Sequence, residues 1–172
     1  MSKPKLYLML GYPGAGKTTA AGIISKLTGA VHLASDQVRL ELFPQPSFSE
    51  TEHQKLYQVL NERTKEFLSQ GKSVVYDANL NRYQHRQEKY EIAKQSGAQP
   101  ILVWLQVDKK LAKQRATHEL RNHLVPAEEN PAEMFERIVS IFEPPDKNET
   151  AMILNGTSLS DDYVKEKLDL WR

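Results

Sequence analysis

The segment from Lys5 to Thr18 constrains the fold of this chain more than any other, because it joins a strand to a helix through a glycine-rich loop. Lys5 to Leu10 is a near-continuous apolar run, which is typical of a strand with both faces covered. The run ends at Gly11, and a helical pattern begins at about Lys17. Strands of this kind occur in parallel sheets with helices on both faces, so we expect an α/β fold.

Strand-like and helix-like segments alternate along the rest of the chain, and no internal repeat interrupts them. We expect strands at 5–10, 31–33, 73–76, 100–107 and 151–154, and helices at 17–27, from 35 to the prolines at 44 and 46, at 49–71, 81–96, 108–120, from 130 to the prolines at 144 and 145, and at 160–171. This order predicts a five-stranded parallel sheet with helical crossovers.

Length and composition narrow the class of protein. The chain has 172 residues, which predicts a single domain over 1–172. It has no cysteine, which excludes disulfides and thiolate metal sites, and its formal charge is only +1, so no bulk field recruits nucleic acid. We find neither a signal peptide nor a run of 18 apolar residues, and we expect no membrane partner and a cytoplasmic location.

Residues 11 to 18 read GYPGAGKT and match the phosphate-binding pattern G-x-x-x-x-G-K-[ST] in its required place between a strand and a helix. Glycines let successive amides approach phosphate oxygens, and the helix N-terminus adds positive potential. Lys17 would reach the β and γ phosphates of ATP, and the Thr18 hydroxyl would hold Mg²⁺. A plain turn with a solvated Lys17 is the alternative. The expected nucleotide-binding residues are Gly11, Tyr12, Pro13, Gly14, Ala15, Gly16, Lys17, Thr18 and Thr19.

Two aspartates follow strands that should end beside this loop. Asp36 and Arg39 begin the helix after the second strand, and Asp77 ends the third. Ligands of parallel sheets bind outside the carboxyl ends of the strands, so these residues should share one crevice with the loop. Asp36 is a candidate general base or a helix N-cap, Asp77 a candidate Mg²⁺ ligand or a turn residue, and Arg39 a substrate contact or the partner of a surface charge near Glu41.

The chain resembles the small P-loop kinases that include polynucleotide 5′-hydroxyl kinases, zeta toxins and chloramphenicol phosphotransferase. The resemblance rests on GYPGAGKTT at 11–19, SDQVR at 35–39, VVYDANLNRYQHR at 74–86, and LQVDKKLAKQR at 105–115 followed by NPAEMFERIVSIFEPP. It implies a three-layer P-loop NTPase fold of the nucleoside-kinase type with a small lid. It also implies that Asp36 is the base for the acceptor hydroxyl, that Arg39 fixes the acceptor, and that Asp77 supports that pair.

The resemblance further implies that lid arginines, matched by Arg115 and Arg121, meet the nucleotide phosphates. The segment 121–130 joins two well-capped helices, so we expect it to be a lid that orders on nucleotide binding. A solvated helix face is the alternative for both arginines, and it is the interpretation that we favour for Arg82 and Arg86. Trp104 is expected in the core. Together these features predict transfer of the γ-phosphoryl group of ATP, with Mg²⁺, to a hydroxyl acceptor that is a nucleic acid 5′-end or a small molecule. The alternative is an ATP-binding module or ATPase without a dedicated acceptor.

Overall fold

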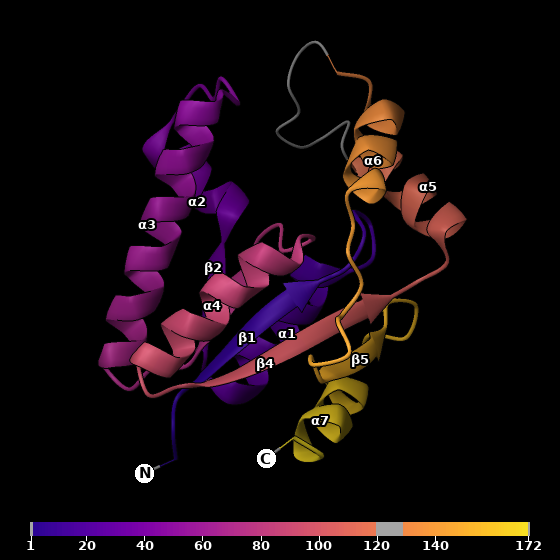
Figure 1. Cartoon of the computed structure of the whole chain (residues 1–172). Helices are drawn as coiled ribbons and strands as arrows, with labels where there is room; N and C mark the ends of the chain where they lie inside the picture. The colour runs from indigo at the N-terminus through magenta and orange to yellow at the C-terminus, as the bar shows by residue number, and fades with distance from the viewer. Residues whose placement is uncertain (1, 120–128, 172) are drawn as a thin grey trace.

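The computed structural model describes residues 2–119 and 129–171, which form one parallel sheet with helices on both of its faces (Figure 1). The strands are β1 (Lys5–Leu10), β2 (Val31–Ala34), β3 (Val74–Asp77), β4 (Gln99–Gln106) and β5 (Ala151–Asn155). Their order across the sheet is β2-β3-β1-β4-β5, and every pairing is parallel. The expected α/β fold with five parallel strands is confirmed.

Alternation along β1 explains why the sheet is covered on both sides. Leu6, Leu8 and Leu10 pack with one hydrophobic cluster, whereas Tyr7 and Met9 pack with the other. Successive side chains of a strand point to opposite faces, so an unbroken apolar run supplies two cores. The helices are α1 (Lys17–Thr28), α2 (Ser35–Leu42), α3 (Glu50–Ser69), α4 (Tyr83–Gln95), α5 (Lys109–Glu119), α6 (Pro131–Ser140) and α7 (Asp161–Asp169).

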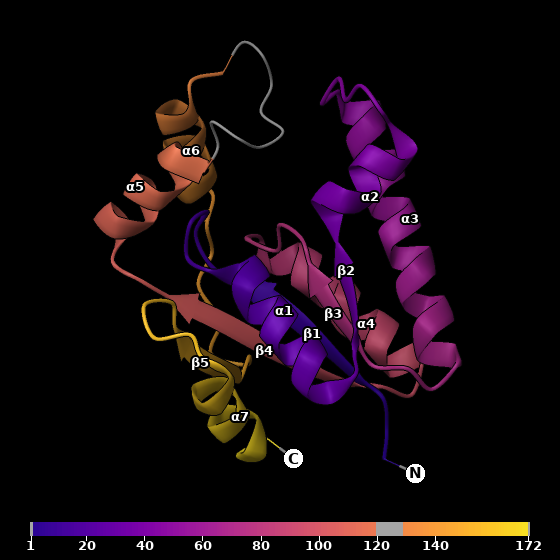
Figure 2. The same cartoon turned by 180° about the vertical axis from the view of Figure 1, so that it is seen from behind.

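Each face of the sheet is covered by its own pair of helices. Leu56 and Leu60 of α3 and Ile92 of α4 belong to the cluster with Leu6 and its neighbours, and Ile24 of α1 and Val164 of α7 belong to the other. Figure 2, which shows the molecule from behind, has α1 and α7 on the near side of the sheet. The middle layer is therefore the sheet, with α3 and α4 on one face and α1 and α7 on the other.

Most expected helix starts are confirmed by their caps. The Ser49 hydroxyl accepts from the Glu52 amide at the start of α3, and the Asn130 side chain accepts from the Ala132 amide at the start of α6, which has Pro131 at its first position. The Asp108 carboxylate accepts from the Lys110 and Leu111 amides at the start of α5. These polar side chains satisfy N–H groups that have no partner within the helix.

The N-terminus of α4 departs from the expectation. The helix begins at Tyr83 rather than at Asn81, because the Glu143 carboxylate, from the segment after α6, accepts from the Tyr83 amide at 2.6 Å. The interpretation of Arg86 as a solvated residue is wrong. Its side chain is fully buried, where it donates to both carboxylate oxygens of Glu149 and to the Leu80 and Glu143 carbonyls. Arg82 is exposed, as expected.

Two groups of helices rise beyond the carboxyl edge of the sheet, with α2 and the start of α3 on one side and α5 and α6 on the other (Figures 1 and 2). The expected lid at 121–130 lies mostly outside the described residues, which resume at Glu129. Within the described residues, no helix has the length and apolar character needed to cross a bilayer.

Candidate functional site

The phosphate-binding loop connects β1 to α1 at the carboxyl edge of the sheet. Gly14 has φ +78° and Gly16 has φ +101°, in the left-handed region that favours glycine. A Cβ on Gly14 would lie 2.3 Å from the carbonyl oxygen of Ala112 in α5, and one on Gly16 would lie 2.9 Å from the side chain of Leu159. The glycines are thus required both by the turn and by close packing against α5 and the segment after β5.

Lys17 stands at the first position of α1 and folds back over the loop. Its ammonium group donates to the carbonyl oxygens of Gly11 at 2.8 Å and Tyr12 at 3.0 Å. Burial lowers the pKa of Lys17 to about 8, although the charges of Asp77 and Asp36 act in the opposite direction. Both carboxylates are therefore close enough to influence the lysine, as expected for residues that share one crevice.

Asp77 ends β3 and joins two neighbouring elements. One oxygen of its buried carboxylate, Oδ2, accepts a hydrogen bond from the Thr18 hydroxyl at 3.0 Å and lies 2.9 Å from Nε2 of His32 on β2. The β2 and β3 register pairs Ala34 with Asp77, so His32 approaches from the adjacent strand. This arrangement brings together the two residues that the sequence suggests as Mg²⁺ ligands.

Asp36 lies in the first turn of α2, where it is exposed. The N-cap of this helix is Ala34, and no side chain forms a cap hydrogen bond, so the alternative of Asp36 as an N-cap is wrong. No hydrogen bond to its carboxylate is found among the described residues. The carboxylate is thus available to a ligand at the same edge as Lys17.

Arg39 is buried on the same helix, with 8% of its surface exposed. Its guanidinium donates to the buried carboxylate of Glu52 on α3 and lies 4.9 Å from the centroid of the Phe48 ring. Glu52 also accepts from the amide and the hydroxyl of Ser47 at 2.7 and 2.9 Å. The suggested pairing of Arg39 with a charge near Glu41 is wrong, since Glu41 binds Arg63 instead.

Arg115 lies on the second turn of α5 and donates to the carbonyl oxygen of Gly156, just after β5, at 3.1 Å. A Cβ on Gly156 would lie only 2.1 Å from the carbonyl oxygen of Ala15 in the phosphate-binding loop. Arg115 is therefore positioned beside the loop. Its expected partner Arg121 lies outside the described residues.

The remaining loop residues differ in exposure. Tyr12 and Pro13 are half-buried, Ala15 is buried, and Thr18 and Thr19 are exposed. The Tyr12 ring packs edge-on against Phe142 and Phe135, with centroids 4.9 and 6.4 Å apart. The loop is therefore in direct contact with Phe135 of α6 and with Phe142, which follows that helix.

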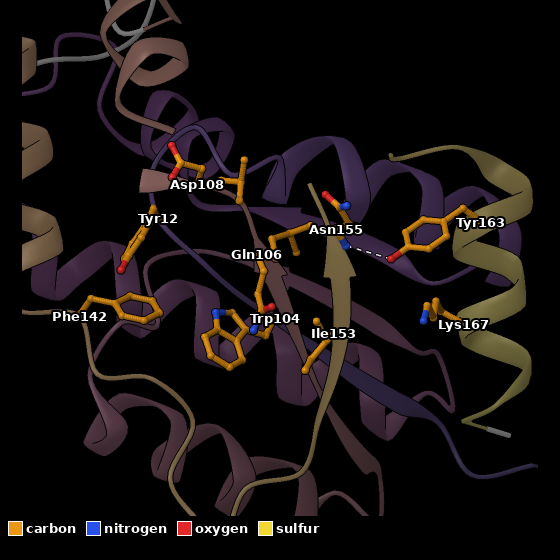
Figure 3. A pocket seen from close by; sticks show the side chains of 11 residues that line it. Tyr12, Trp104, Gln106, Asp108, Phe142, Ile153, Asn155, Tyr163 and Lys167 are labelled. Carbon is orange, nitrogen blue, oxygen red and sulfur yellow. Dashed lines mark hydrogen bonds between the residues drawn. The ribbon is translucent and has the colours of Figure 1, made fainter. Parts of the chain in front are cut away.

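A cavity of about 600 Å³ opens beside Tyr12 on the face of β4 and β5 (Figure 3). Its lining includes Trp104 and Ile153, which are paired in register, but none of Lys17, Thr18, Asp36 or Asp77. Trp104 is half-buried and packs against the hydrophobic cluster that contains Leu102, so it lies at the margin of the core beside Ile153, which is 47% exposed. We identify the functional site from the charged groups at the carboxyl edge of the sheet rather than from this cavity.

Sequence reasoning missed three residues of the site: His32, Glu52 and Gly156. A polar residue inside a short strand was the available signal for His32, and the N3 position of a capping box was the signal for Glu52. Neither pattern reveals that His32 contacts Asp77 on the next strand, or that Glu52 binds Arg39 on the next helix. The glycine that follows the β5 run was the corresponding signal for Gly156.

Comparisons with solved structures agree with this fold. The chain superposes on the APS kinase CysC of Mycobacterium tuberculosis, solved with AMPPNP and APS, with a TM-score of 0.68 and 16% identity over 99% of both chains. A gluconokinase from Sinorhizobium meliloti gives a TM-score of 0.68 and 16% identity over 98% of this chain and 92% of that one. A chain of the Pnkp1/Rnl/Hen1 RNA repair complex gives a TM-score of 0.64 and 19% identity, covering 88% of this chain and 51% of that one.

No curated protein matches the sequence. At these identities the structural matches establish the fold, which is that of the small P-loop kinases. The AAA_33 family model, described as an AAA domain, matches residues 6–145, a range that contains the phosphate-binding loop, Asp36, Asp77 and Arg115. The chain belongs to the AAA_33 family of P-loop proteins.

Proposed function

We propose that this protein transfers the γ-phosphoryl group of ATP to the hydroxyl group of an acceptor. The observation that carries the proposal is the meeting of three groups at one edge of the sheet. These are the phosphate-binding loop with Lys17, the contact between Thr18 and Asp77, and the free carboxylate of Asp36. Phosphoryl transfer needs positioned cations, a metal and an in-line hydroxyl more than covalent help from the protein.

The residues present fit a nucleotide and its metal. Gly14 and Gly16 have positive φ, the backbone conformation that favours glycine and that lets a loop of this kind turn successive amides toward phosphate oxygens. The Thr18 hydroxyl and the Asp77 carboxylate are oxygen donors of the kind that Mg²⁺ prefers, and phosphates commonly complete such sites. Bound MgATP would supply the transferred phosphoryl group and neutralise part of its charge.

The chain's own residues would act around that group. The Lys17 ammonium group would give up its hydrogen bonds to the loop carbonyls and donate to phosphate oxygens, where its positive charge offsets theirs. Asp36 accepts the proton of the acceptor hydroxyl, which makes the oxygen a better nucleophile. His32 orients Asp77 through its hydrogen bond, and Arg115 adds a cation on the opposite side of the loop.

The acceptor would lie on the α2 side of this site, where the exposed carboxylate of Asp36 is; Arg39, buried on the same helix, ties α2 to α3 through Glu52. Both acceptor classes have a structural relative, since the similar proteins include a gluconokinase and a chain of an RNA repair complex. A formal charge of +1 gives no general attraction for nucleic acid, so we favour a small molecule. A cytoplasmic location remains a prediction, consistent with the lack of cysteine.

A transfer assay with γ-labelled ATP tests the proposal. The purified protein is incubated with Mg²⁺ and either a panel of small hydroxyl compounds or 5′-hydroxyl oligonucleotides. We expect stoichiometric label on one acceptor, and a rate of labelling about 10²- to 10⁴-fold lower with Asp36→Asn. Release of inorganic phosphate as the sole product, undiminished by that substitution, would instead support the ATPase alternative.

A further inference from the structure

A second, smaller cavity lies between α3 and α4 and has no part in the mechanism above. Its volume is about 170 Å³, and its lining comes from the first half of each helix: His53, Gln54, Tyr57, His85, Glu88 and Lys89. Complete small-molecule sites are usually about 300 to 1,000 Å³, so this cavity fits part of a ligand rather than a whole one.

Lys89 is the most unusual residue of this lining. Its side chain is 1% exposed, and its ammonium group lies 5.4 Å from the centroid of the Tyr76 ring. An ammonium group has three N–H donors, but the described residues provide one acceptor, Glu88 Oε2 at 2.6 Å. Buried donors normally find acceptors, so the remaining N–H groups indicate room for an acceptor from outside the chain.

Two histidines from different helices add further donors to the same cavity. Burial lowers the pKa of His53, and the charge of Arg39 and the neighbouring His85 lower it further, while Glu52 acts in the opposite direction. Burial also lowers the pKa of His85. The charged groups that affect the pKa of His85 are Lys89 and Arg82, which lower it, and Glu88 and Glu143, which raise it. The surroundings of both rings thus disfavour an additional positive charge, and a bound anion would remove that penalty.

Glu88 is the one acidic residue in the lining, and its charge is already compensated. Oε2 accepts from Lys89, and Oε1 accepts from the Asn61 side-chain amide at 3.0 Å. The Glu88 side chain is 55% exposed, so water also screens it. The cavity therefore offers mainly N–H donors, because the Tyr57 hydroxyl already donates to the Asn79 carbonyl at 3.4 Å.

The cavity adjoins the proposed acceptor side of the active site. His53 Nδ1 lies 3.4 Å from Arg39 Nη2, and the His53 and Tyr57 rings stack with centroids 4.6 Å apart. Arg39 lies on α2, the helix that carries Asp36, so the cavity borders the acceptor side through the contact between His53 and Arg39. A ligand bound beside Asp36 would therefore have this cavity next to it.

We propose that the cavity between α3 and α4 binds an anionic group, a carboxylate or a phosphate, of the acceptor. The lining donors are Lys89, His53 and His85, and Tyr57 separates this subsite from Asp36. That the anion belongs to the acceptor rests on the proposed function, whereas binding of an anion in the cavity does not. The acceptor would then be a small hydroxy acid or phosphate ester.

The first experiment follows the histidine rings by NMR in the full-length protein. AMPPNP with Mg²⁺ saturates the phosphate-binding loop, and sodium sulfate, which keeps its charge over the titration, is compared with sodium chloride at equal ionic strength. We expect sulfate to raise the pKa of His53 and His85 saturably by about one unit, and to have no effect on His118, which does not line the cavity. Identical titration of His53 and His85 in the two salts would overturn the proposal.

The second experiment uses substitutions at the cavity. His53→Gln and His85→Gln, alone and together, keep the ring positions polar, and His118→Gln is the matched control. We expect the double variant to bind sulfate at least 10-fold more weakly while its melting temperature without sulfate stays near that of the control. Lys89→Gln should abolish sulfate binding if it folds, and the histidine variants carry the test if it does not. Unchanged sulfate affinity in the double variant would refute the assignment.

A transfer assay then identifies the source of the anion. The acceptors are a polyhydroxy acid, the neutral polyol of the same length, and a 5′-hydroxyl oligonucleotide. We expect the acid to have the highest kcat/KM and the double histidine variant to raise its KM about 10-fold with little change in kcat. The same histidine dependence with the oligonucleotide alone would assign the anion to a nucleic acid phosphate and overturn the small-acid acceptor. Equal use of acid and polyol would refute the acceptor subsite, whereas sulfate binding without any transfer would refute the proposed function alone.

Discussion

Gly156→Ala tests whether the contact between the phosphate-binding loop and the segment after β5 holds the site in its working geometry. Gly156 is packed against three elements at once. Its amide donates to the Gln106 carbonyl at 2.9 Å, its own carbonyl accepts from Arg115, and its Cα faces the carbonyl oxygen of Ala15. The substitution adds one methyl group at the point where these elements meet.

The size of the effect follows from the contact distance. An alanine Cβ would lie 2.1 Å from the Ala15 oxygen, and these atoms must separate by about 0.9 Å to reach 3.0 Å, the practical limit for such contacts. Both sides are backbone, so no flexible side chain can absorb the movement. Overpacking of this kind costs about 1 to 3 kcal/mol of stability, and misplacement of reacting groups by about 1 Å can lower turnover about 10²-fold.

Gly22→Ala is the matched control, because a Cβ at this exposed position of α1 meets nothing within 4 Å. It should stabilise the protein by about 0.5 to 1 kcal/mol, since alanine is the better helix former. Urea unfolding gives the two stabilities, and the thermal shift with saturating MgATP reports on the loop. A Gly156→Ala protein with wild-type stability and MgATP shift would refute the reasoning that this contact holds the loop.

Three further substitutions test the remaining assignments. Lys17→Ala should preserve the fold, measured by circular dichroism, but lower turnover by more than about 10²-fold, the loss of roughly 3 kcal/mol of charge stabilisation; near-wild-type turnover would remove the loop from the mechanism. Asp36→Asn should lower turnover about 10²- to 10⁴-fold with unchanged affinity for ATP, and, because Asp36 caps no helix, with unchanged melting temperature. Glu149→Gln should cost about 3 to 5 kcal/mol in urea unfolding, because it leaves the fully buried Arg86 without its counter-charge. Burial alone would raise the pKa of Glu149, but hydrogen bonds from Arg86, Tyr90 and the Asp146 amide lower it overall. Ionised Glu149 should therefore stabilise the wild-type fold above about pH 4.3, and this stabilisation should decline below that pH. The Glu149→Gln variant should lack that decline.

The sequence by itself determined the elements whose signals are local. The apolar run of β1 predicts a strand covered on both faces, and the capping residues Ser49 and Asn130 predict the starts of α3 and α6 within one residue. The phosphate-binding loop could be identified because its function depends on consecutive backbone amides. Asp36 and Asp77 could be placed at the same edge as the loop because parallel strands present their carboxyl ends together.

Only the tertiary structure decided which distant groups meet. Arg86 looks like a solvated helix residue in the sequence, yet it is fully buried because Glu149, 63 residues away, provides both of its carboxylate oxygens. Glu52 is the counter-charge of Arg39, and His32 is the partner of Asp77, although nothing near them in the chain specifies either pair. Helical and strand periodicities encode which face of an element is buried, but not the register against its neighbour. Buried charges are tolerated only where a partner compensates their desolvation, so the packing of helices and strands determined which of these polar residues are structural and which, like Asp36, remain free to bind a ligand.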